Sequence, residues 1–415
     1  MQLIHTSDWH LGHHLHGLNR DYEHRRFLNW LLDTLEDRRA DALLVSGDIF
    51  DSANPSAAAQ TLYYQFLAES RRRLPDLDLV IVAGNHDSAS RLDAPKPLLK
   101  AFNIHVIGSL GRTPSGNIDV DALLVPLTNQ NRETAAWCAA VPFLRPADLP
   151  RAGKGDDWLV KGVREIYDEV FTALSQRRGP GQALVATGHA YLTGTQLSEL
   201  SERKIQVGNQ QAIPVDVFPE HAAYTALGHL HRAQRVGRRD HVRYSGSPLP
   251  LSLDEADYLH QVVAVTLNGE AAAKVESVPV PRAVDIIRLP KGKQDLTVEE
   301  LLPLLHELPN RETTALARHE YPYLELSVFL NKPEPGLRKQ LEDVLTDKAV
   351  RLLKIKTKYP KSRESLADSL PQQSLSQLSP ADVFTRRYQS LFEGEPSKAM
   401  TTAFHELWDQ AGTVP

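Results

Sequence analysis

Five short polar motifs along the chain carry side chains that can bind metal ions, and each follows apolar residues typical of a β-strand. Strands that end at one edge of a sheet would deliver these Asp, Asn and His side chains to a single rim. Carboxylate, amide and imidazole groups gathered in this way suit two divalent cations, a pair that hydrolyses phosphate esters. The motifs are Asp8-Trp9-His10, Gly47-Asp48-Ile49-Phe50-Asp51, Gly84-Asn85-His86-Asp87, Gly188-His189 and Gly228-His229-Leu230-His231.

The first two motifs would supply the centre of such a metal site. Side chains alternate along a strand, so Asp8 and His10 are expected to point to the same side and bind one ion. Asp48 ends a buried strand, and its two carboxylate oxygens can bridge two ions about 3.5–4 Å apart.

The later motifs complete the two ligand sets. Asn85 can offer a carbonyl oxygen to the second ion and His189 a ring nitrogen. The alternation that applies to the first motif would let His229 and His231 reach one ion each. Mixed nitrogen and oxygen ligands suit Mn²⁺, with Mg²⁺, iron or Zn²⁺ as alternatives, so two Mn²⁺ ions are expected.

His86 should face the phosphate rather than the metals. There it could stabilise the transition state or protonate the departing oxygen. Asp87 is expected to orient His86 or to cap the following turn. The reaction predicted for this set is in-line displacement at phosphorus without a covalent enzyme intermediate. Each motif alone is a weak signal, and the ordered set of five is what favours a metal site.

The length of 415 residues predicts two or three structural units. Strand-like and helical runs alternate over residues 1–280, and the last strands come without helices between them. This pattern predicts an α/β unit in which two mixed sheets pack between helical layers. Residues 281–360 follow a shorter pattern, predicted as a small α/β capping domain. Residues 361–378 have the polar composition of a linker.

Residues 379–415 are predicted to form a helical segment. Ser379 as N-cap, Pro380 at the first helical position and Asp382 at the third favour a helix start. Two short helices beyond a linker are too small to bury both apolar faces, so we expect a docking element for another protein, with packing onto their own domain as the alternative. The apolar residues of these faces are Val383, Phe384, Tyr388, Leu391, Phe392, Phe404, Leu407 and Trp408.

The composition is that of an ordinary folded protein, with 41% hydrophobic and 24% charged residues. With a net charge of −5, any contact with nucleic acid must come from local basic patches. The start of the chain lacks a signal-peptide pattern, and no segment approaches ~18 apolar residues, so we expect a cytoplasmic protein. The lone Cys138 is expected to be a small buried residue.

The order of the motifs resembles the calcineurin-like metallophosphoesterase superfamily. Within it, the residues Thr6-Ser7-Asp8-Trp9-His10-Leu11-Gly12, Gly47–Asp51 and Tyr244-Ser245-Gly246-Ser247-Pro248 are similar to the bacterial SbcD family, nuclease subunits of the SbcC–SbcD complex that processes double-strand breaks. The resemblance covers essentially the whole chain. It implies a Mn²⁺-dependent DNA nuclease of DNA repair and recombination. Such an enzyme acts as a 3′ to 5′ exonuclease on duplex ends and an endonuclease on single strands and hairpins.

The resemblance also implies roles for individual residues and partners. Asp8, His10, Asp48 and His231 would hold one Mn²⁺, and Asp48, Asn85, His189 and His229 the other, with His86 acting on the phosphate. Asp51 stands where some relatives have a phosphate-facing His, so it is expected instead to orient a ligand or a bound water. The implied partners are DNA, an ABC ATPase of the SbcC type that binds ATP and the C-terminal helices, and a second copy that pairs through helices near residues 56–72 and 90–102.

Contacts with DNA are predicted from basic residues. Arg351, Lys354, Lys356 and Lys358 form a basic stretch, and its three lysines would give the capping domain one charged strand face that meets phosphates, or would protect an edge strand from aggregation. Arg20 could line the DNA groove or belong to a solvated loop.

Two other functions compete with the nuclease hypothesis. One is a phosphodiesterase or phosphatase for small molecules from the same superfamily. Protein phosphatases of the superfamily place Arg directly after the second Asp of the Gly47–Asp51 motif, where this chain has Ser52, which argues against a phosphatase. The other is a scaffold without catalytic activity, which the full set of predicted ligands disfavours.

Overall fold

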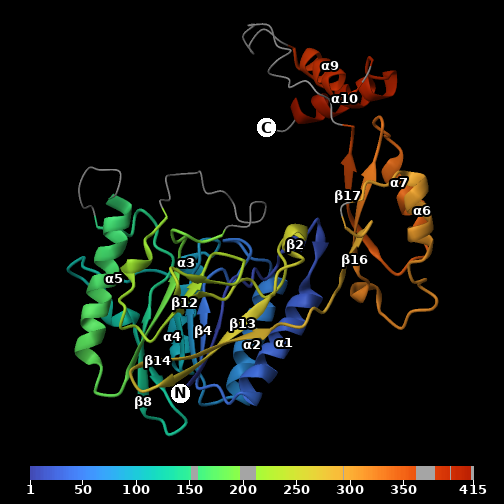
Figure 1. Ribbon diagram of the computed structural model, residues 1–415. Helices are drawn as coiled ribbons and strands as arrows, with labels where there is room; N and C mark the ends of the chain where they lie inside the picture. The colour runs from blue at the N-terminus through green and yellow to red at the C-terminus, as the bar shows by residue number, and fades with distance from the viewer. Residues whose placement is uncertain (151–157, 197–211, 293, 361–378, 393, 413–415) are drawn as a thin grey trace. The chain divides into compact units, whose positions relative to one another are not determined.

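The computed structural model describes the whole chain except residues 151–157, 197–211, 293, 361–378, 393 and 413–415 (Figure 1). The chain divides into two compact units, Met1–Ala283 and Val284–Pro415. In the part that is described, no helix is long and apolar enough to cross a membrane.

The first unit contains two six-stranded sheets. The first sheet has the order β14-β13-β1-β4-β5-β6. Its strands β1, β4, β5 and β6 are parallel, while β13 runs antiparallel to β1 and forms a hairpin with β14. The apolar runs of β4 and β5 are buried throughout, as expected for strands covered on both faces. The bounds are β1 (Gln2–Thr6), β4 (Ala42–Ser46), β5 (Asp78–Val82), β6 (Ile104–Ile107), β13 (Gln261–Asn268) and β14 (Ala271–Pro279).

The second sheet has the order β11-β12-β10-β9-β8-β7. Strands β8, β9, β10 and β12 are parallel, and the edge strands β7 and β11 are antiparallel to their neighbours. Cys138 is fully buried in β8, where the sequence predicted a small hydrophobic residue. The bounds are β7 (Leu124–Thr128), β8 (Thr134–Ala140), β9 (Ala183–His189), β10 (Tyr224–Gly228), β11 (Gln234–Val236) and β12 (Arg239–Tyr244).

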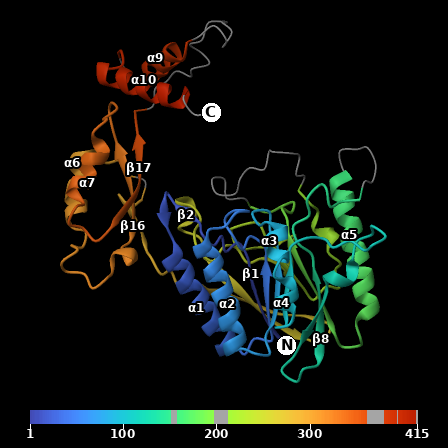
Figure 2. The same ribbon diagram turned by 180° about the vertical axis from the view of Figure 1, so that it is seen from behind.

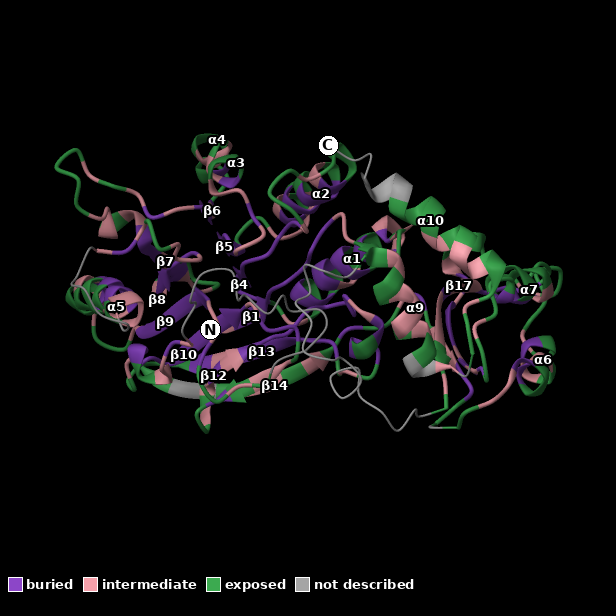
Figure 3. Cartoon of the chain, turned by 90° about the horizontal axis from the view of Figure 1, so that it is seen from above, coloured by how far each residue is buried: buried purple, intermediate pink, exposed green. Residues whose placement is uncertain are grey.

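Helices cover the outer faces of the two sheets, as Figures 2 and 3 show. The helices α1 (Asp21–Asp37), α2 (Ala57–Arg73), α3 (Ala89–Asp93) and α4 (Lys96–Lys100) lie on the side of the first sheet, and α5 (Trp158–Arg177) lies on the second. One apolar core fills the space between the sheets and beneath α5, and another lies beneath α1 and α2. The prediction of two mixed sheets between helical layers is therefore confirmed.

The second unit begins with a three-stranded parallel sheet of order β15-β16-β17. Its helices α6 and α7 pack on one face of the sheet through an apolar core that includes Leu301, Leu341 and Leu326. Helix α6 starts at a capping box in which Thr297 and Glu300 satisfy each other's backbone amides. The order is β15 (Ile286–Leu289), α6 (Val298–His306), β16 (Tyr323–Phe329), α7 (Leu337–Val344) and β17 (Arg351–Lys358), which confirms the predicted small α/β pattern.

The C-terminal segment forms α9 (Pro380–Leu391) and α10 (Lys398–Gly412). Helix α9 starts at Ser379 through a capping box with Asp382, where the sequence predicted a helix start. The rings of Phe384 and Phe404 stack with their centroids 4.5 Å apart, which joins the two helices. The predicted linker 361–378 and the side chain of Leu391 lie outside the described residues.

Candidate metal centre

The loops that carry the predicted ligands all start at the carboxyl ends of central strands. Strands β1, β4 and β5 of the first sheet lead into Asp8, Asp48 and Asn85, and strands β9 and β10 of the second sheet lead into His189 and His229. Hydrogen bonds link the two sheets at this rim. The hydroxyl of Ser46 donates to the carbonyl of Ala226 at 3.0 Å, and Nδ1 of His189 donates to the carbonyl of Ser46 at 2.9 Å.

Left-handed backbone conformations, rather than strand alternation, aim several of these side chains. Strand β1 ends at Thr6, two residues before Asp8, so the alternation argument for Asp8 and His10 was wrong. Asp8, His10, Asp48 and His229 have φ angles of 54°, 46°, 51° and 105°. Each such residue costs about 1–3 kcal/mol and persists only where the surrounding structure enforces it.

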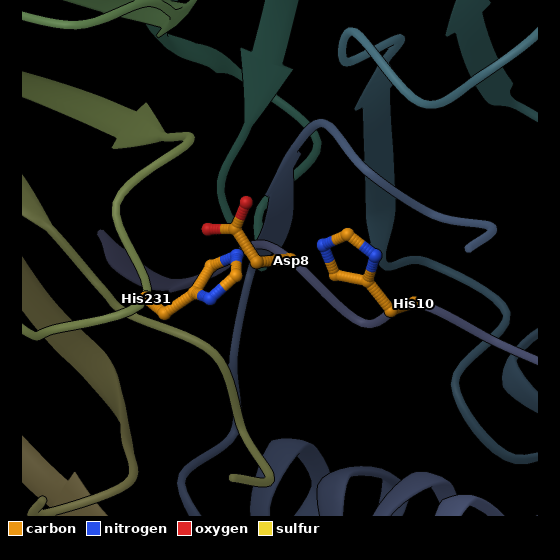
Figure 4. A group of neighbouring side chains, drawn as sticks. All are labelled: Asp8, His10 and His231. Carbon is orange, nitrogen blue, oxygen red and sulfur yellow. The ribbon is translucent and has the colours of Figure 1, made fainter. Parts of the chain in front are cut away.

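One group consists of Asp8, His10 and His231 (Figure 4). Each offers one ligand atom, and these three atoms lie within 4.8 Å of one another. His231 donates from Nδ1 to Oε1 of Glu255 at 2.8 Å, which leaves Nε2 as the nitrogen for a metal. Nδ1 of His10 is hydrogen-bonded to Oδ1 of Asp51 at 3.2 Å. Its Nε2 is buried and has no hydrogen-bond partner among the described residues.

A second group comes from Asp8, Asp48 and His189, again within 4.8 Å. Nε2 of His189 lies 3.4 Å from Oδ2 of Asp48 and 2.9 Å from Oδ1 of Asn85. Nδ1 of His229 lies 3.0 Å from the same Asn85 oxygen. Oδ2 of Asp48 is also 3.5 Å from Nε2 of His10, so this carboxylate stands between the two groups.

Electrostatics favours the ionised form of the central carboxylate. Burial raises the pKa of Asp48, but the neighbouring His189 and His10 outweigh burial and bring it well below its usual value. Burial opposes the charged form of His189, yet the Asp48 carboxylate raises its pKa to about 9. Burial and the nearby His189 lower the pKa of His229 to about 3. A metal bound at His189 would therefore displace a proton.

Two glycines are required by the close approach of these loops. A Cβ on Gly84 would lie 2.1 Å from Oδ1 of Asp48, and one on Gly47 would lie 2.2 Å from Nδ1 of His189. Gly47 also has a φ of 91°, which side chains disfavour. Both positions leave room for the ligands only because they lack a side chain.

The carboxylates of Asp87 and Asp51 contact the loops that carry the candidate ligands. The buried carboxylate of Asp87 accepts hydrogen bonds from the amides of Gly84, Ile49 and Phe50 at 2.8, 3.1 and 3.0 Å. It thereby joins two loops, and within the described part of the chain it forms no hydrogen bond with the ring of His86, so the predicted orienting role finds no contact to support it. His86 donates from Nδ1 to the carbonyl of Asp51 at 2.8 Å, which leaves Nε2 to face a metal or a substrate. His86 also forms a third group with His10 and Asp48 whose ligand atoms lie within 4.8 Å of one another.

Glu255 is a residue of this site that no motif in the sequence indicated. It is fully buried after β12, in the short 3-10 helix Leu253–Glu255. Besides His231, its carboxylate accepts the amide of Leu251 at 2.7 Å. Glu255 therefore fixes the orientation of a candidate ligand through a contact that only the fold brings about.

The structure is at odds with the predicted DNA contact of Arg20. This side chain is only 1% exposed. Its guanidinium donates twice to the carboxylate of Glu23 and once to the carbonyl of Pro250. A guanidinium enclosed in this way offers no surface to DNA.

The basic residues of β17 are for the most part paired within their own unit. Lys356 pairs with the buried Glu325 at 2.7 Å, and Lys358 pairs with Asp295. The guanidinium of Arg351 lies over the ring of Tyr323, 4.2 Å from its centroid. Among the three lysines of this strand, Lys354 is the one that forms no hydrogen bond or ion pair with any described residue, so its charge remains available.

The residues present fit two divalent cations. The carboxylates of Asp8 and Asp48 face imidazole nitrogens whose partner nitrogens are held by Glu255, Asp51 or a carbonyl, the usual support for metal-binding histidines. The buried Nε2 of His10, without a described partner, is the orphaned atom that a metal would satisfy.

The family models agree with this geometry. The model for calcineurin-like phosphoesterases matches residues 1–233, more than half of the chain. The model described as the type 5 capsule protein repressor C-terminal domain matches residues 282–391. The chain belongs to the calcineurin-like phosphoesterase family, and within it to the SbcD proteins.

Relatives matched over two thirds or more of their length place the chain among the SbcD proteins. The chain is 38% identical to the SbcD component of nuclease SbcCD from Rhodobacter capsulatus, over 94% of both chains. It is 30% identical to the protein of the same name from Escherichia coli strain K12, over 98% of both. The Bacillus subtilis protein of that name is 34% identical over 66% of this chain and 68% of its own.

Proposed function

We propose that this chain is the metal-dependent nuclease subunit of an ATPase–nuclease complex, and that it hydrolyses phosphodiester bonds of DNA. The observation that carries the proposal is the pair of buried ligand groups that share Asp8 and meet at Asp48. The name that the relatives share supports DNA as the substrate.

In this proposal one ion is held by Asp8, His10, Asp48 and His231, and the other by Asp48, Asn85, His189 and His229. Mn²⁺ is the proposed metal, since the ligands mix nitrogen and oxygen. Bound there, the ions would neutralise the phosphate and lower the pKa of an attacking water.

The protein's own contribution to the reaction centres on His86. Because the Asp51 carbonyl can only accept a hydrogen bond, Nδ1 of His86 carries a hydrogen. In the cationic ring Nε2 carries a second proton, and this is the proton that His86 would pass to the departing oxygen, leaving the neutral ring with its hydrogen on Nδ1. The amide of His86 donates to Oδ1 of Asp48 at 2.8 Å. This bond fixes the position of His86 relative to the carboxylate between the two ligand groups.

The C-terminal helices are proposed as the docking element for an ATPase of the SbcC type. Val383, Leu407 and Trp408 are 42%, 66% and 54% exposed. Phe384 and Phe404 instead stack on each other between the two helices. Deleting residues 379–415 should leave metal binding and hydrolysis of a small phosphodiester unchanged while abolishing association with the ATPase. Retained association in a pull-down would remove the docking role.

A homodimer through α2 and the segment that includes α4 is the second proposed assembly. Tyr64 on α2, Leu98 on α4 and Phe102 just beyond it are 41%, 64% and 53% exposed. Apolar side chains exposed on one segment are typical of a protein interface.

The test of the nuclease proposal compares substrates. The purified chain with Mn²⁺ is incubated with end-labelled duplex, hairpin and single-stranded DNA, beside a small phosphodiester. His86→Ala should lose cleavage of DNA, whereas His221→Ala, an exposed histidine just before β10 and so at the opposite end of that strand from the ligands, should keep it. Cleavage of the small ester alone, even with the ATPase added, would favour a phosphodiesterase or phosphatase for small molecules.

A further inference from the structure

A segment after β8 crosses the loop that bears Asn85 and His86. The amide of Phe143 donates to the carbonyl of Ala83 at 2.8 Å, at the end of β5. Two residues later, the guanidinium of Arg145 donates to the carbonyl of Asp87 at 3.1 Å. These bonds fix Phe143 and Arg145 at the rim of the candidate metal centre.

Ring contacts connect Arg145 to a candidate metal ligand. The rings of Phe143 and His189 meet edge to face with centroids 6.1 Å apart. The guanidinium carbon of Arg145 lies 5.7 Å from the centroid of the Phe143 ring. Phe143, Leu144 and Tyr191 also line an apolar hollow that has His189 in its wall. A cation, an aromatic ring and an apolar surface therefore stand together beside the metal centre.

The charge of Arg145 is not neutralised within the protein. Among the described residues, no carboxylate pairs with its guanidinium, and the side chain is only half-buried. The nearby Asp148 instead accepts the backbone amide of Arg145 at 2.8 Å, which fixes the bend of the segment. An arginine that is held in place by a carbonyl and keeps donors unused is suited to a phosphate.

We propose that Arg145 binds the phosphate next to the scissile one, and that the base between the two phosphates lies against Phe143 and the apolar hollow. The proposal rests on the proposed nuclease function and names how a nucleotide substrate is held. Arg145 would be a positioning residue for an extended strand. A small ester without a neighbouring nucleotide would not use it. Base stacking on an aromatic side chain is a common means of holding single strands without reading their sequence.

The experiment uses the full-length protein with Mn²⁺ and two readouts. The first is kcat/KM for a small phosphodiester, which cannot reach a neighbouring subsite. The second is the inhibition constant of a short phosphorothioate oligonucleotide against that reaction. In Arg145→Ala the first readout should stay within about twofold of wild type, and the inhibition constant should rise about 10-fold or more through loss of a charge-assisted bond. Phe143→Leu should raise the inhibition constant by a smaller factor.

The matched control is Arg132→Ala. Arg132 is an exposed arginine in the turn before β8, at the opposite end of that strand from Phe143. It should change neither readout. Arg145→Lys should restore part of the inhibition, since a lysine keeps the charge but not the planar fork.

Each result separates the possible failures. If Arg145→Ala lowered kcat/KM for the small ester by as large a factor as it raised the inhibition constant, Arg145 would only support the ligand loop. If the inhibition constant did not change, Arg145 would touch no nucleotide. Either result would overturn the subsite alone. If the wild type cleaves the small ester but neither cleaves DNA nor is inhibited by the oligonucleotide, the nuclease function itself is overturned together with the subsite.

Discussion

Replacing Glu255 tests how far the candidate metal centre depends on a residue that binds no metal. Its two carboxylate oxygens accept hydrogen bonds from two donors, Nδ1 of His231 at 2.8 Å and the amide of Leu251 at 2.7 Å. In Glu255→Gln the side chain keeps its shape but has only one acceptor oxygen for these two donors. One of these two hydrogen bonds is lost in a fully buried place, which costs about 1–3 kcal/mol.

We expect Glu255→Gln to lower the affinity for Mn²⁺ at one of the two sites. A glutamine at this position holds the ring of His231 less firmly in its orientation and tautomer than the carboxylate does, and substitutions of this kind lower metal affinity about 10–100-fold, or ~1.4–2.8 kcal/mol. Titration of Mn²⁺ into the metal-free protein, followed by calorimetry, should show one weakened site and one site close to wild type. Activity on a small phosphodiester should recover at high Mn²⁺.

The control for this prediction is Glu276→Gln, an exposed carboxylate that pairs with Arg38 at 2.9 Å. It should bind Mn²⁺ like the wild type. An unchanged binding isotherm in Glu255→Gln would show that His231 does not need this carboxylate to bind a metal. Equal weakening of both sites together with a lower melting temperature would mean that Glu255 supports the fold rather than one ligand.

Three further predictions concern the ligand loops, acid stability and assembly. Gly84→Ala should abolish Mn²⁺ binding in calorimetry because its Cβ would lie 2.1 Å from Oδ1 of Asp48, whereas Gly336→Ala, with no atom within 4 Å, should bind normally. Burial lowers the pKa of His5 to about 3 from 6.5, so the stability that its neutral form gives is complete above pH 6.5 and is lost as pH falls towards 3. At about pH 5 the free energy of unfolding in urea should be ~2 kcal/mol lower than above pH 6.5, and His5→Asn should show little of this pH dependence. An equal decrease in the variant would contradict the assignment to His5. Leu98→Glu should give monomers in sedimentation experiments if α4 lies in the dimer interface, and an unchanged dimer would exclude that surface.

The sequence was sufficient for the elements and for most of the side chains that the fold gathers in the candidate metal centre. The apolar runs before the motifs predicted β1, β4, β5, β9 and β10 because a strand buried on both faces leaves a continuous apolar signature. The polar signature of a helix start was equally local, and Ser379 and Asp382 cap α9. Local patterns of this kind depend only on neighbours in the sequence.

The parts that the sequence did not predict depend on contacts between distant segments. Left-handed angles at Asp8 and His10 are imposed by the surrounding loops and leave no periodic trace. Glu255 meets His231 from 24 positions further along the sequence, and no motif indicated this contact. The burial of Arg20 depends on the carbonyl of Pro250, which no pattern near residue 20 indicates.

The division of the candidate ligands between the two sheets has a consequence for folding. Asp8, His10, Asp48 and Asn85 follow strands of the first sheet, while His189, His229 and His231 belong to the second. In the assignment proposed above, each ion would take ligands from both halves of the sandwich, so neither half alone could form a complete coordination sphere. Metal affinity would then be thermodynamically linked to the docking of one sheet on the other. Substitutions deep between the sheets, far from any ligand, would therefore lower metal occupancy before they unfold the protein.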